Sequence, residues 1–540
     1  MEIKPLQLKQ NKLMDHYRNG KMDILNQFDY NPYAADAYQH RLKDLNEGTF
    51  DREQLVTVLY EVNKNWNGSA HTYQNIDKLK QEDSVVVVGG QQAGLLTGPF
   101  YTIHKIISII QFAKQQEDAL HVPVIPVFWI AGEDHDFAEI NHIFMPQTSY
   151  MEKNKLLQRV SEKWSVSDIP IEKGDIDQWI KRIFEQLQET AYTSELYETV
   201  MKQMEASKSY VDFFARLIYV LFQEEGIVLI DSHHPEMRAF EKEFFINMIN
   251  EQEAISKGVW QEQKKLQEKG YQLTLDVDKN DSHLFYHNEN ERILLVKNEE
   301  GNWVGKQNEL SFTKQELLQI ARTTPELLSN NVVTRPVMQE MVFPTLAFIG
   351  GPGEVNYWSM LKPAFHALGV KMPPVVPRLS FTYVDRQTEK ILSKYEIPVR
   401  EAIEHGISMM KAEWLDGKND PSVQQVSDQV KADIERIHQP LREIASQTRS
   451  DIRHLADKNL QYLKRDVEYL EERIVKAIEE IYAHEISEFD TVDICLHPMD
   501  GLQERVWNPV VWINMYGTEF IHELTDKNLS FSNDHYVVYI

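Results

Sequence analysis

The densest group of reactive side chains follows directly on an apolar segment that ends at Ile130. It is the run Glu133, Asp134, His135 and Asp136. Acids and an imidazole at the end of a buried strand need a partner, which can be water, a cation or a substrate amine. We predict that this run is catalytic, with Asp134 or Asp136 as general base if apolar neighbours raise its pKa. A metal site that adds His142 and a solvated acidic loop are the alternatives.

A glycine-rich loop, GGQQAGLLTGPFYTIHK, runs from Gly89 to Lys105 between an apolar run and a helical pattern. Glycines let a backbone approach a ligand closely, and a helix start can bind an anion. The spacing matches neither GxGxxG nor the P-loop, so a plain tight turn is the alternative. The predicted contacts to a nucleotide or an activated carboxyl group are Gly90, Gln91, Gln92, Gly94, Thr97, Gly98, His104 and Lys105.

Four further groups are candidate binding residues, and each has a structural alternative. Asp231 and His233 follow an apolar run and resemble a helix cap. The loop after the run 345–349 contributes Gly353, Glu354, Asn356 and Tyr357, where plain turn geometry is the alternative. Arg335 and Arg378, the latter with Ser380 nearby, fit a carboxylate or phosphate or else a salt bridge. Gly501, Arg505 and Trp507 fit a second nucleotide site or a surface loop.

The order of elements around these residues predicts how they meet. Apolar, β-branched runs at 85–88, 123–130, 227–230 and 345–349 alternate with helical patterns. Strands of this kind indicate an α/β fold with a Rossmann-like, doubly wound parallel sheet. Ligands in such sheets bind at the carboxyl ends of the strands, where the candidate loops lie.

Two insertions and a long arm interrupt this pattern. The predicted parts are a first core segment at 1–144, a helical insertion at 145–225, core again at 226–269, a small antiparallel β insertion at 270–312, core at 313–390, a coiled-coil arm at 391–490 and a C-terminal return segment at 491–540. We expect strands in YQLTLDV, HLFYH and RILLV of the β insertion. In the arm, apolar residues recur in steps of four and three with a phase slip near Ile452, which predicts a coiled coil and a helix of about 45 residues beyond Pro440.

The composition limits the partners. A net charge of −26 opposes binding to nucleic acid and to anionic membranes, and the apolar runs are too short to span a bilayer. Cys495 is the only cysteine, so we expect no internal disulfide, no cysteine metal cluster and a cytoplasmic location. We also expect Cys495, in a strand-like run, to be structural rather than the nucleophile.

Five segments together resemble the bacillithiol biosynthesis cysteine-adding enzyme family: GQQAGLLTGPFYTIHK, FWIAGEDHDFAEI, FIGGPGEVNYW, PRLSFT and LQERVWNP. The resemblance covers essentially the whole chain. It implies a core similar to class I aminoacyl-tRNA synthetases and nucleotidyltransferases, inserted connecting modules, and a homodimer through the coiled coil. It also implies a ligase that adds cysteine to the amino group of glucosaminyl malate, with ATP or another nucleotide activating the cysteine carboxylate. Arg335 and Arg378 would then hold the malate carboxylates.

Two other classes of function stay open. One is a metal-dependent hydrolase or deacetylase of a small amino-sugar substrate that uses the loop at 133–136. The other is a non-catalytic scaffold organised by the coiled coil.

Overall fold

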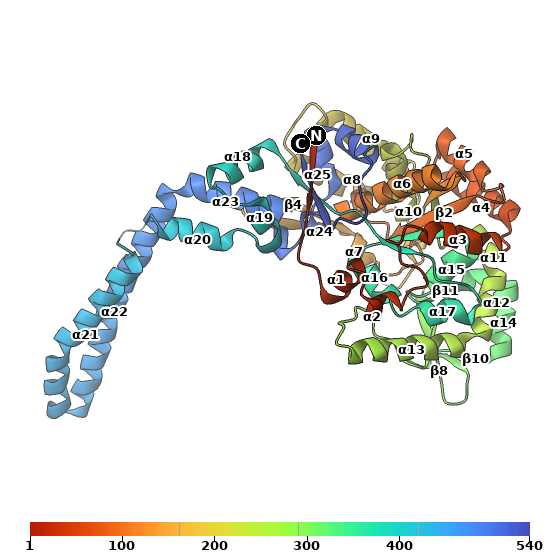
Figure 1. The fold of residues 1–540 in the computed structure, drawn as a ribbon. Coiled ribbons are helices and arrows are strands. Elements are labelled where there is room, and N and C mark those ends of the chain that lie inside the picture. The colour runs from red at the N-terminus through yellow and green to blue at the C-terminus, as the bar shows by residue number, and fades with distance from the viewer. Residues whose placement is uncertain (161–162, 290, 419–420) are drawn as a thin grey trace. The chain divides into compact units, whose positions relative to one another are not determined.

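The computed structural model describes residues 1–160, 163–289, 291–418 and 421–540. Residues 161–162, 290 and 419–420, which fall in the expected helical insertion, β insertion and arm, lie outside the described residues. The chain forms two compact units (Figure 1). Unit 1 comprises Met1–Met145, Glu152–Tyr383 and Gln503–Ile540, and unit 2 comprises Pro146–Met151 and Val384–Leu502.

Unit 1 is built on a five-stranded parallel sheet with the strand order β13-β12-β2-β3-β6. Its strands are β2 (Val85–Gln91), β3 (Val124–Ile130), β6 (Val228–Asp231), β12 (Thr345–Gly350) and β13 (Val375–Pro377). The first strand, β2, lies in the middle, and the chain continues outward on one side through β3 and β6 and on the other through β12 and β13. This is the Rossmann order, and its topological switch point lies between β2 and β12. The Rossmann-like sheet predicted from the sequence is confirmed.

The strands are apolar along their whole length because helices cover the sheet on both faces. Every residue of β3 and of β12 is buried. The helix α6 (Phe100–Leu120) packs on β2 and β3, α4 (Arg52–Asn65) on β6, and α3 (Ala37–Asn46) on β12.

Three further sheets are present, of which the smallest pairs β4 (His142–Pro146) with β5 (Met151–Lys155). An antiparallel sheet of order β10-β9-β8-β7-β11 is formed by β7 (Asp281–Asn288), β8 (Glu291–Lys297), β9 (Trp303–Gly305), β10 (Ser311–Phe312) and β11 (Leu328–Asn330). The expected strands HLFYH and RILLV lie in β7 and β8, but residues 271–277 are not a strand, so that prediction was wrong. In the third sheet, β1 (Glu2–Leu6) pairs antiparallel with β15 (His535–Tyr539), which neighbours β14 (Phe381–Val384).

The remaining elements of unit 1 are mostly short. The helices are α1 (Lys12–Arg18), α2 (Met22–Leu25), α5 (Ala70–Lys78), α7 (Phe137–Ile140), α8 (Lys173–Gln186), α9 (Thr193–Glu205), α10 (Tyr210–Leu221), α11 (Pro235–Phe240), α12 (Lys242–Asn250), α13 (Gln252–Glu268), α14 (Lys314–Thr323), α15 (Thr334–Val342), α16 (Pro352–Trp358), α17 (Lys362–Ala367), α24 (Gln503–Val506), α25 (Pro509–Tyr516) and α26 (Glu519–Thr525). None of the helices in the described part of the chain is long and apolar enough to cross a membrane.

Unit 2 is helical and contains a hairpin of two long helices (Figure 1). Its helices are α18 (Arg386–Lys394), α19 (Val399–His405), α20 (Ser408–Asp416), α21 (Val423–Thr448), α22 (Ser450–Ile481) and α23 (Ala483–Leu496). The side chains of His438 and Asn459 are 3.0 Å apart, and Lys464 forms an ion pair with Glu435. These contacts show that α21 and α22 pair antiparallel within the hairpin.

Two details of the arm differ from the sequence-based prediction. The helix continues through Pro440 and ends at Thr448, so a helix of about 45 residues beyond that proline was wrong. The phase slip near Ile452 corresponds to the turn at Arg449, whose extended backbone reverses the chain. Cys495 lies in the helix α23 and not in a strand, although it is buried as expected.

Candidate active site

A cavity of about 410 Å³ opens at the carboxyl ends of the parallel strands in unit 1. Residues after β2, β3, β12 and β13 line it together with α15 and α16, so it lies at the switch point of the sheet, where this fold binds ligands. The lining residues are Gly90, Gln91, Gln92, Tyr101, Lys105, Trp129, Ala131, Asp134, Thr274, Arg335, Pro336, Gln339, Phe348, Gly351, Pro352, Gly353, Glu354, Tyr357, Arg378 and Arg505.

The two glycines near the end of β2, Gly89 and Gly90, are needed for close backbone packing. A Cβ atom at Gly90 would lie 2.5 Å from the carbonyl oxygen of Trp129 on the neighbouring strand, and one at Gly89 would lie 2.8 Å from that of Ile349. Such contacts are too short for any other residue. From the sequence alone, glycine is expected here so that a ligand can approach the backbone. The structure shows instead that glycine lets the neighbouring strands approach it.

Cationic groups dominate the cavity wall. Lys105 reaches back to the end of β2, where Nζ donates to the carbonyl of Gly90 at 2.7 Å and forms an ion pair with Glu354 at 2.5 Å. Burial lowers the pKa of the Lys105 ammonium, and Glu354 offsets this only in part. Arg335 and Arg505 also line the cavity, and neither forms an ion pair within the described part of the chain. They are the cations that an anionic ligand would meet.

Arg378 lines the same cavity but already has a carboxylate partner. Its guanidinium donates two hydrogen bonds of 2.7 Å to Glu504, and both side chains are buried. Glu504 also accepts from Ser380 at 2.9 Å and contacts Nδ1 of His104 at 2.7 Å. Burial alone would raise the pKa of Glu504, but Arg378 and His104 hold it well below its usual range. The sequence left open whether Arg378 binds a ligand or forms a salt bridge, and the structure shows the salt bridge to Glu504.

Asp134 is the residue of the acidic run that reaches the cavity. Its carboxylate accepts a 2.8 Å hydrogen bond from Gln92 and lies 3.6 Å from Arg292. Burial opposes the charged form, yet Arg292 and Gln92 together hold the pKa of Asp134 below its ordinary value. Asp134 is therefore an ionised carboxylate, and the expectation of a raised pKa at this position was wrong.

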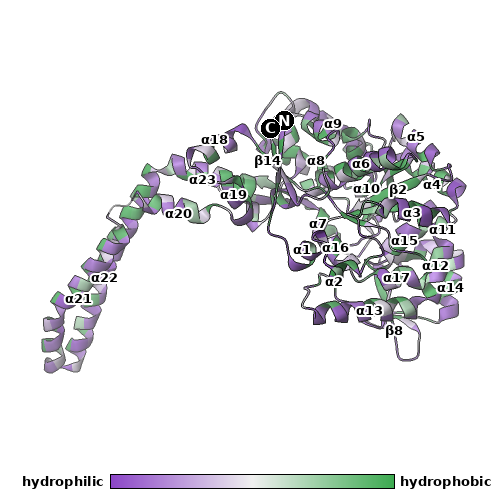
Figure 2. Cartoon of the chain, in the orientation of Figure 1, coloured by the Kyte–Doolittle hydropathy of each residue, from purple (hydrophilic) through white to green (hydrophobic). Residues whose placement is uncertain are grey.

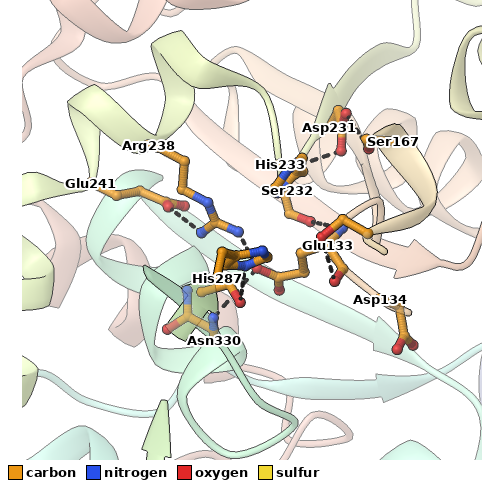
Figure 3. A network of polar contacts seen from close by, with 12 residues as sticks. Glu133, Asp134, Ser167, Asp231, Ser232, His233, Arg238, Glu241, His287 and Asn330 are labelled. Carbon is orange, nitrogen blue, oxygen red and sulfur yellow. Dashed lines mark hydrogen bonds and ion pairs between the residues drawn. The ribbon is translucent and has the colours of Figure 1, made fainter. Parts of the chain in front are cut away.

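Glu133 points the opposite way, into a buried polar cluster (Figure 3). Its carboxylate contacts Arg238, which also donates to Glu241 at 2.8 Å. One cation thus faces two fully buried acids, and burial raises the pKa of Glu241 to about 8. Glu133 lies in the turn after β3, where the N–H of Asp134 donates to the carbonyl of Ala131 at 3.2 Å, so Glu133 is anchored in the cluster while Asp134 lines the cavity.

The other two residues of the run lie outside the cavity lining. His135 is part-exposed beside Arg292, with Nδ1 3.4 Å from the guanidinium, and burial and Arg292 both lower its pKa. Asp136 is exposed. Within the described residues, no three His, Cys, Asp or Glu side chains are grouped so that they could hold a metal ion.

Asp231 and His233 belong to a neighbouring turn. Asp231 accepts from Ser167 at 2.7 Å and from the backbone N–H of His233 at 2.9 Å. His233 forms a 2.7 Å contact with Asp168. A Cβ atom at Gly132 would lie about 2 Å from both Ser167 and Asp231, so the loop after β3 packs directly on this turn.

Several predicted contacts support the cavity or lie elsewhere. Asn356 is buried and holds the segment at 272–274, since Oδ1 accepts from the N–H of Thr274 at 2.8 Å and Nδ2 donates to Gln272. Gly94 and Gly98 pack on each other in the loop before α6, and Gly98 has a φ of +73°. Thr97 lines a second, more apolar cavity of about 300 Å³.

The second nucleotide site expected from Gly501, Arg505 and Trp507 stays a prediction. Arg505 lines the cavity and Trp507 is buried against Trp512, with ring centroids 5.8 Å apart. Gly501 belongs to unit 2.

Sequence reasoning missed Tyr101, Trp129, Thr274, Gln339, Phe348, Arg292 and Glu504. A signal existed for Gln339, which follows Arg335 by four residues and therefore shares its helix face. Trp129 and Phe348 were assigned to the core because they lie inside apolar strands.

The cavity sits in a chain that two family models cover almost completely. The model described as Bacillithiol biosynthesis BshC, N-terminal Rossmann-like domain, matches residues 1–379, and that described as Bacillithiol biosynthesis BshC, C-terminal coiled-coil domain, matches residues 381–540. The chain belongs to the BshC family. The resemblance inferred from the sequence is confirmed, and with it the expectation of a ligase.

Relatives within the BshC family align over their full length. The chain is 44% identical over 545 residues to a protein of Oceanobacillus iheyensis, and the alignment covers 100% of both chains. It is 39% identical over 538 residues to proteins of Bacillus thuringiensis (strain Al Hakam) and Bacillus cereus (strain 03BB102), again with 100% of both chains covered. All three are named "Putative cysteine ligase BshC".

Proposed function

We propose that this protein is a cysteine ligase that joins the carboxyl carbon of cysteine to the amino group of glucosaminyl malate, the last step of bacillithiol biosynthesis. The observation that carries the proposal is the cavity at the switch point, where Asp134, Lys105, Glu354 and Arg335 converge, the last without an ion pair among the described residues. An amide-forming ligase needs such a mixture, because it must bind carboxylates and an amine in one place.

The malate part of the substrate carries two carboxylates. Arg335 and Arg505 are the groups that bind them in this proposal, since both line the cavity without a carboxylate partner in the described residues. A guanidinium can hold a carboxylate through two parallel hydrogen bonds. Arg378 is not assigned to this role, because Glu504 occupies its donors.

Cysteine carries an ammonium group, and the ionised Asp134 is its partner. The same lowered pKa makes Asp134 a weak proton acceptor. The proton released by the attacking sugar amine is instead assigned to Glu354. Its Oε2 accepts from Lys105 and from the N–H of Gly351 at 2.7 Å, which leaves Oε1 for the amine.

Amide formation also requires that the cysteine carboxylate be activated. ATP or another nucleotide would supply this chemistry by turning one carboxylate oxygen into a leaving group. Lys105 would hold its phosphates, since Arg335 and Arg505 are assigned to malate, and the closely packed glycines at the end of β2 lie beside this lysine.

We further propose a cytoplasmic homodimer that forms through the arm. The hairpin of α21 and α22 buries polar groups such as Ser427 and His438, whereas Ile437, Leu441 and Leu470 are 72%, 63% and 59% exposed. Green and purple positions alternate along both helices (Figure 2). An apolar stripe of this length is stabilised when a second hairpin covers it.

The test of the ligase proposal is direct synthesis. Pure protein is incubated with cysteine, glucosaminyl malate and ATP, and bacillithiol is followed by mass spectrometry. We expect product with the wild type and at least about 10-fold less with Arg335→Met, as for a lost charged hydrogen bond. Product from the wild type that is undiminished in Arg335→Met would contradict the assignment of this cavity.

A further inference from the structure

One part of the cavity wall is neutral and has two polar atoms without partners. Trp129, Pro336, Gln339 and Phe348 line the cavity together. The indole Nε1 of Trp129 and the amide Oε1 of Gln339 are buried and form no hydrogen bond in the described part of the chain. Among the residues that line the cavity, these are the two with such atoms. A buried donor or acceptor left unpaired is costly, by about 1–3 kcal/mol, so a ligand group that satisfies both is strongly favoured.

We propose that Trp129 and Gln339 form the subsite for the side chain of cysteine, with the thiol bound between the indole N–H and the amide carbonyl. This inference rests on the proposed function. A thiol is a weak donor through S–H and a weak acceptor at sulfur, so it can pair with both atoms at once.

The surroundings of these atoms suit sulfur. Phe348 stacks on Trp358 with ring centroids 4.2 Å apart, and Trp129 packs edge-on against Phe343 at 6.3 Å. The rings of Trp129 and Phe348 are thereby held in place. Contacts of sulfur with aromatic rings are favourable, and this polarizable wall distinguishes a thiol from a hydroxyl.

The position of the subsite agrees with that of the charged groups. Trp129 lies near the end of β3 and Asp134 in the loop that follows, and both line the cavity, so cysteine can place its ammonium on Asp134 and its side chain against Trp129. Gln339 lies one helical turn after Arg335 on α15. The thiol therefore binds beside, and not on top of, the proposed malate site.

The experiment compares L-cysteine with L-2-aminobutyrate, in which a methyl group replaces the thiol at nearly the same volume. Both are titrated by calorimetry into the full chain under reducing conditions. We expect the wild type to bind cysteine about 10-fold more tightly, as for a net hydrogen bond of ordinary strength. Trp129→Phe and Gln339→Leu should each bring this ratio close to one, and serine should bind more weakly than cysteine to the wild type.

Trp303→Phe is the matched control, because Trp303 is equally buried with an unpartnered indole N–H but does not line the cavity. It should keep the wild-type ratio. A ratio that survives in both cavity variants, or a wild type that binds aminobutyrate or serine as tightly as cysteine, overturns the subsite while the proposed ligase stands. A wild type that binds no cysteine contradicts the proposed function itself.

Discussion

Replacing Arg378 and Arg335 by methionine, one at a time, should separate structure from binding within one cavity. Arg378 and Glu504 are 5% and 2% exposed and share two hydrogen bonds of 2.7 Å. Removing one partner of such a pair leaves a buried, uncompensated charge and costs about 3–5 kcal/mol. Arg335 has no carboxylate partner in the described residues, so its loss should change the free energy of unfolding by less than about 1 kcal/mol.

The stability difference can be converted to an unfolding temperature. For a unit of about 400 residues, the entropy of unfolding is ~0.9 kcal/mol/K, so Arg378→Met should lower the midpoint by about 3–6 °C. The assay is thermal unfolding of each variant followed by circular dichroism, together with calorimetric titration of glucosaminyl malate. Arg335→Met should unfold near the wild-type temperature and bind this ligand about 10- to 100-fold more weakly.

The control is Arg322→Met, which removes an exposed arginine of α14 and should change neither measurement. The reasoning is refuted if Arg378→Met unfolds at the wild-type temperature but loses glucosaminyl malate. In that case Arg378 would be a substrate ligand, as the sequence had suggested.

Three further predictions concern other parts of the chain. Asp134→Asn removes the proposed partner of the cysteine ammonium and should lower the rate of bacillithiol formation at least about 10-fold, as for a lost hydrogen bond to a charged group, and a rate near that of the wild type would exclude Asp134 from the reaction. The pKa of Glu241 is raised to about 8 in the folded protein, so its contribution to stability is present below the unfolded value of 4.5 and is lost as the pH rises toward 8. The free energy of unfolding of Glu241→Gln, measured with denaturant between pH 5 and 8, should therefore depend less on pH than that of the wild type. An equal pH dependence in the two proteins would contradict this. Leu441→Lys should convert a dimer to a monomer in light scattering, whereas Cys495→Ser should keep both the dimer and most activity because that thiol is buried in α23.

The parallel sheet could be predicted because each of its strands carries its own signal. The runs at 85–88, 123–130, 227–230 and 345–349 are apolar over their whole length and are followed by turn residues. Parallel strands end at the same edge of a sheet, so the residues that follow these runs were expected to meet there. Gly90, Lys105 and Asp134 do line one cavity at that edge.

Pairings between distant segments could not be predicted in this way. β1 is a strand because Glu2–Leu6 pairs with residues 535–539 at the other end of the chain, and nothing in its local sequence indicates that partner. Glu504 likewise satisfies Arg378 from a segment 126 residues later. Buried charge was recognised from the sequence, but whether its partner was a ligand or a distant acid depended on the fold.

The arm shows how a correct period can give a wrong length. The steps of four and three between apolar residues are real, but the turn at Arg449 falls within the predicted helix and reverses it. The pKa of Asp134 could not be predicted for a similar reason. Its cationic neighbour Arg292 comes from β8, a strand of the antiparallel sheet that is distant in the sequence.

The central claim, that the cavity at the β2–β12 switch point forms bacillithiol, is tested most directly inside cells. Bacillithiol is measured by mass spectrometry in cells whose own copy of this enzyme is replaced by the double variant Asp134→Asn, Arg335→Met, with protein levels checked by immunoblotting. We predict that bacillithiol falls below detection while glucosaminyl malate accumulates. Normal bacillithiol levels in cells that carry only the double variant would contradict the account.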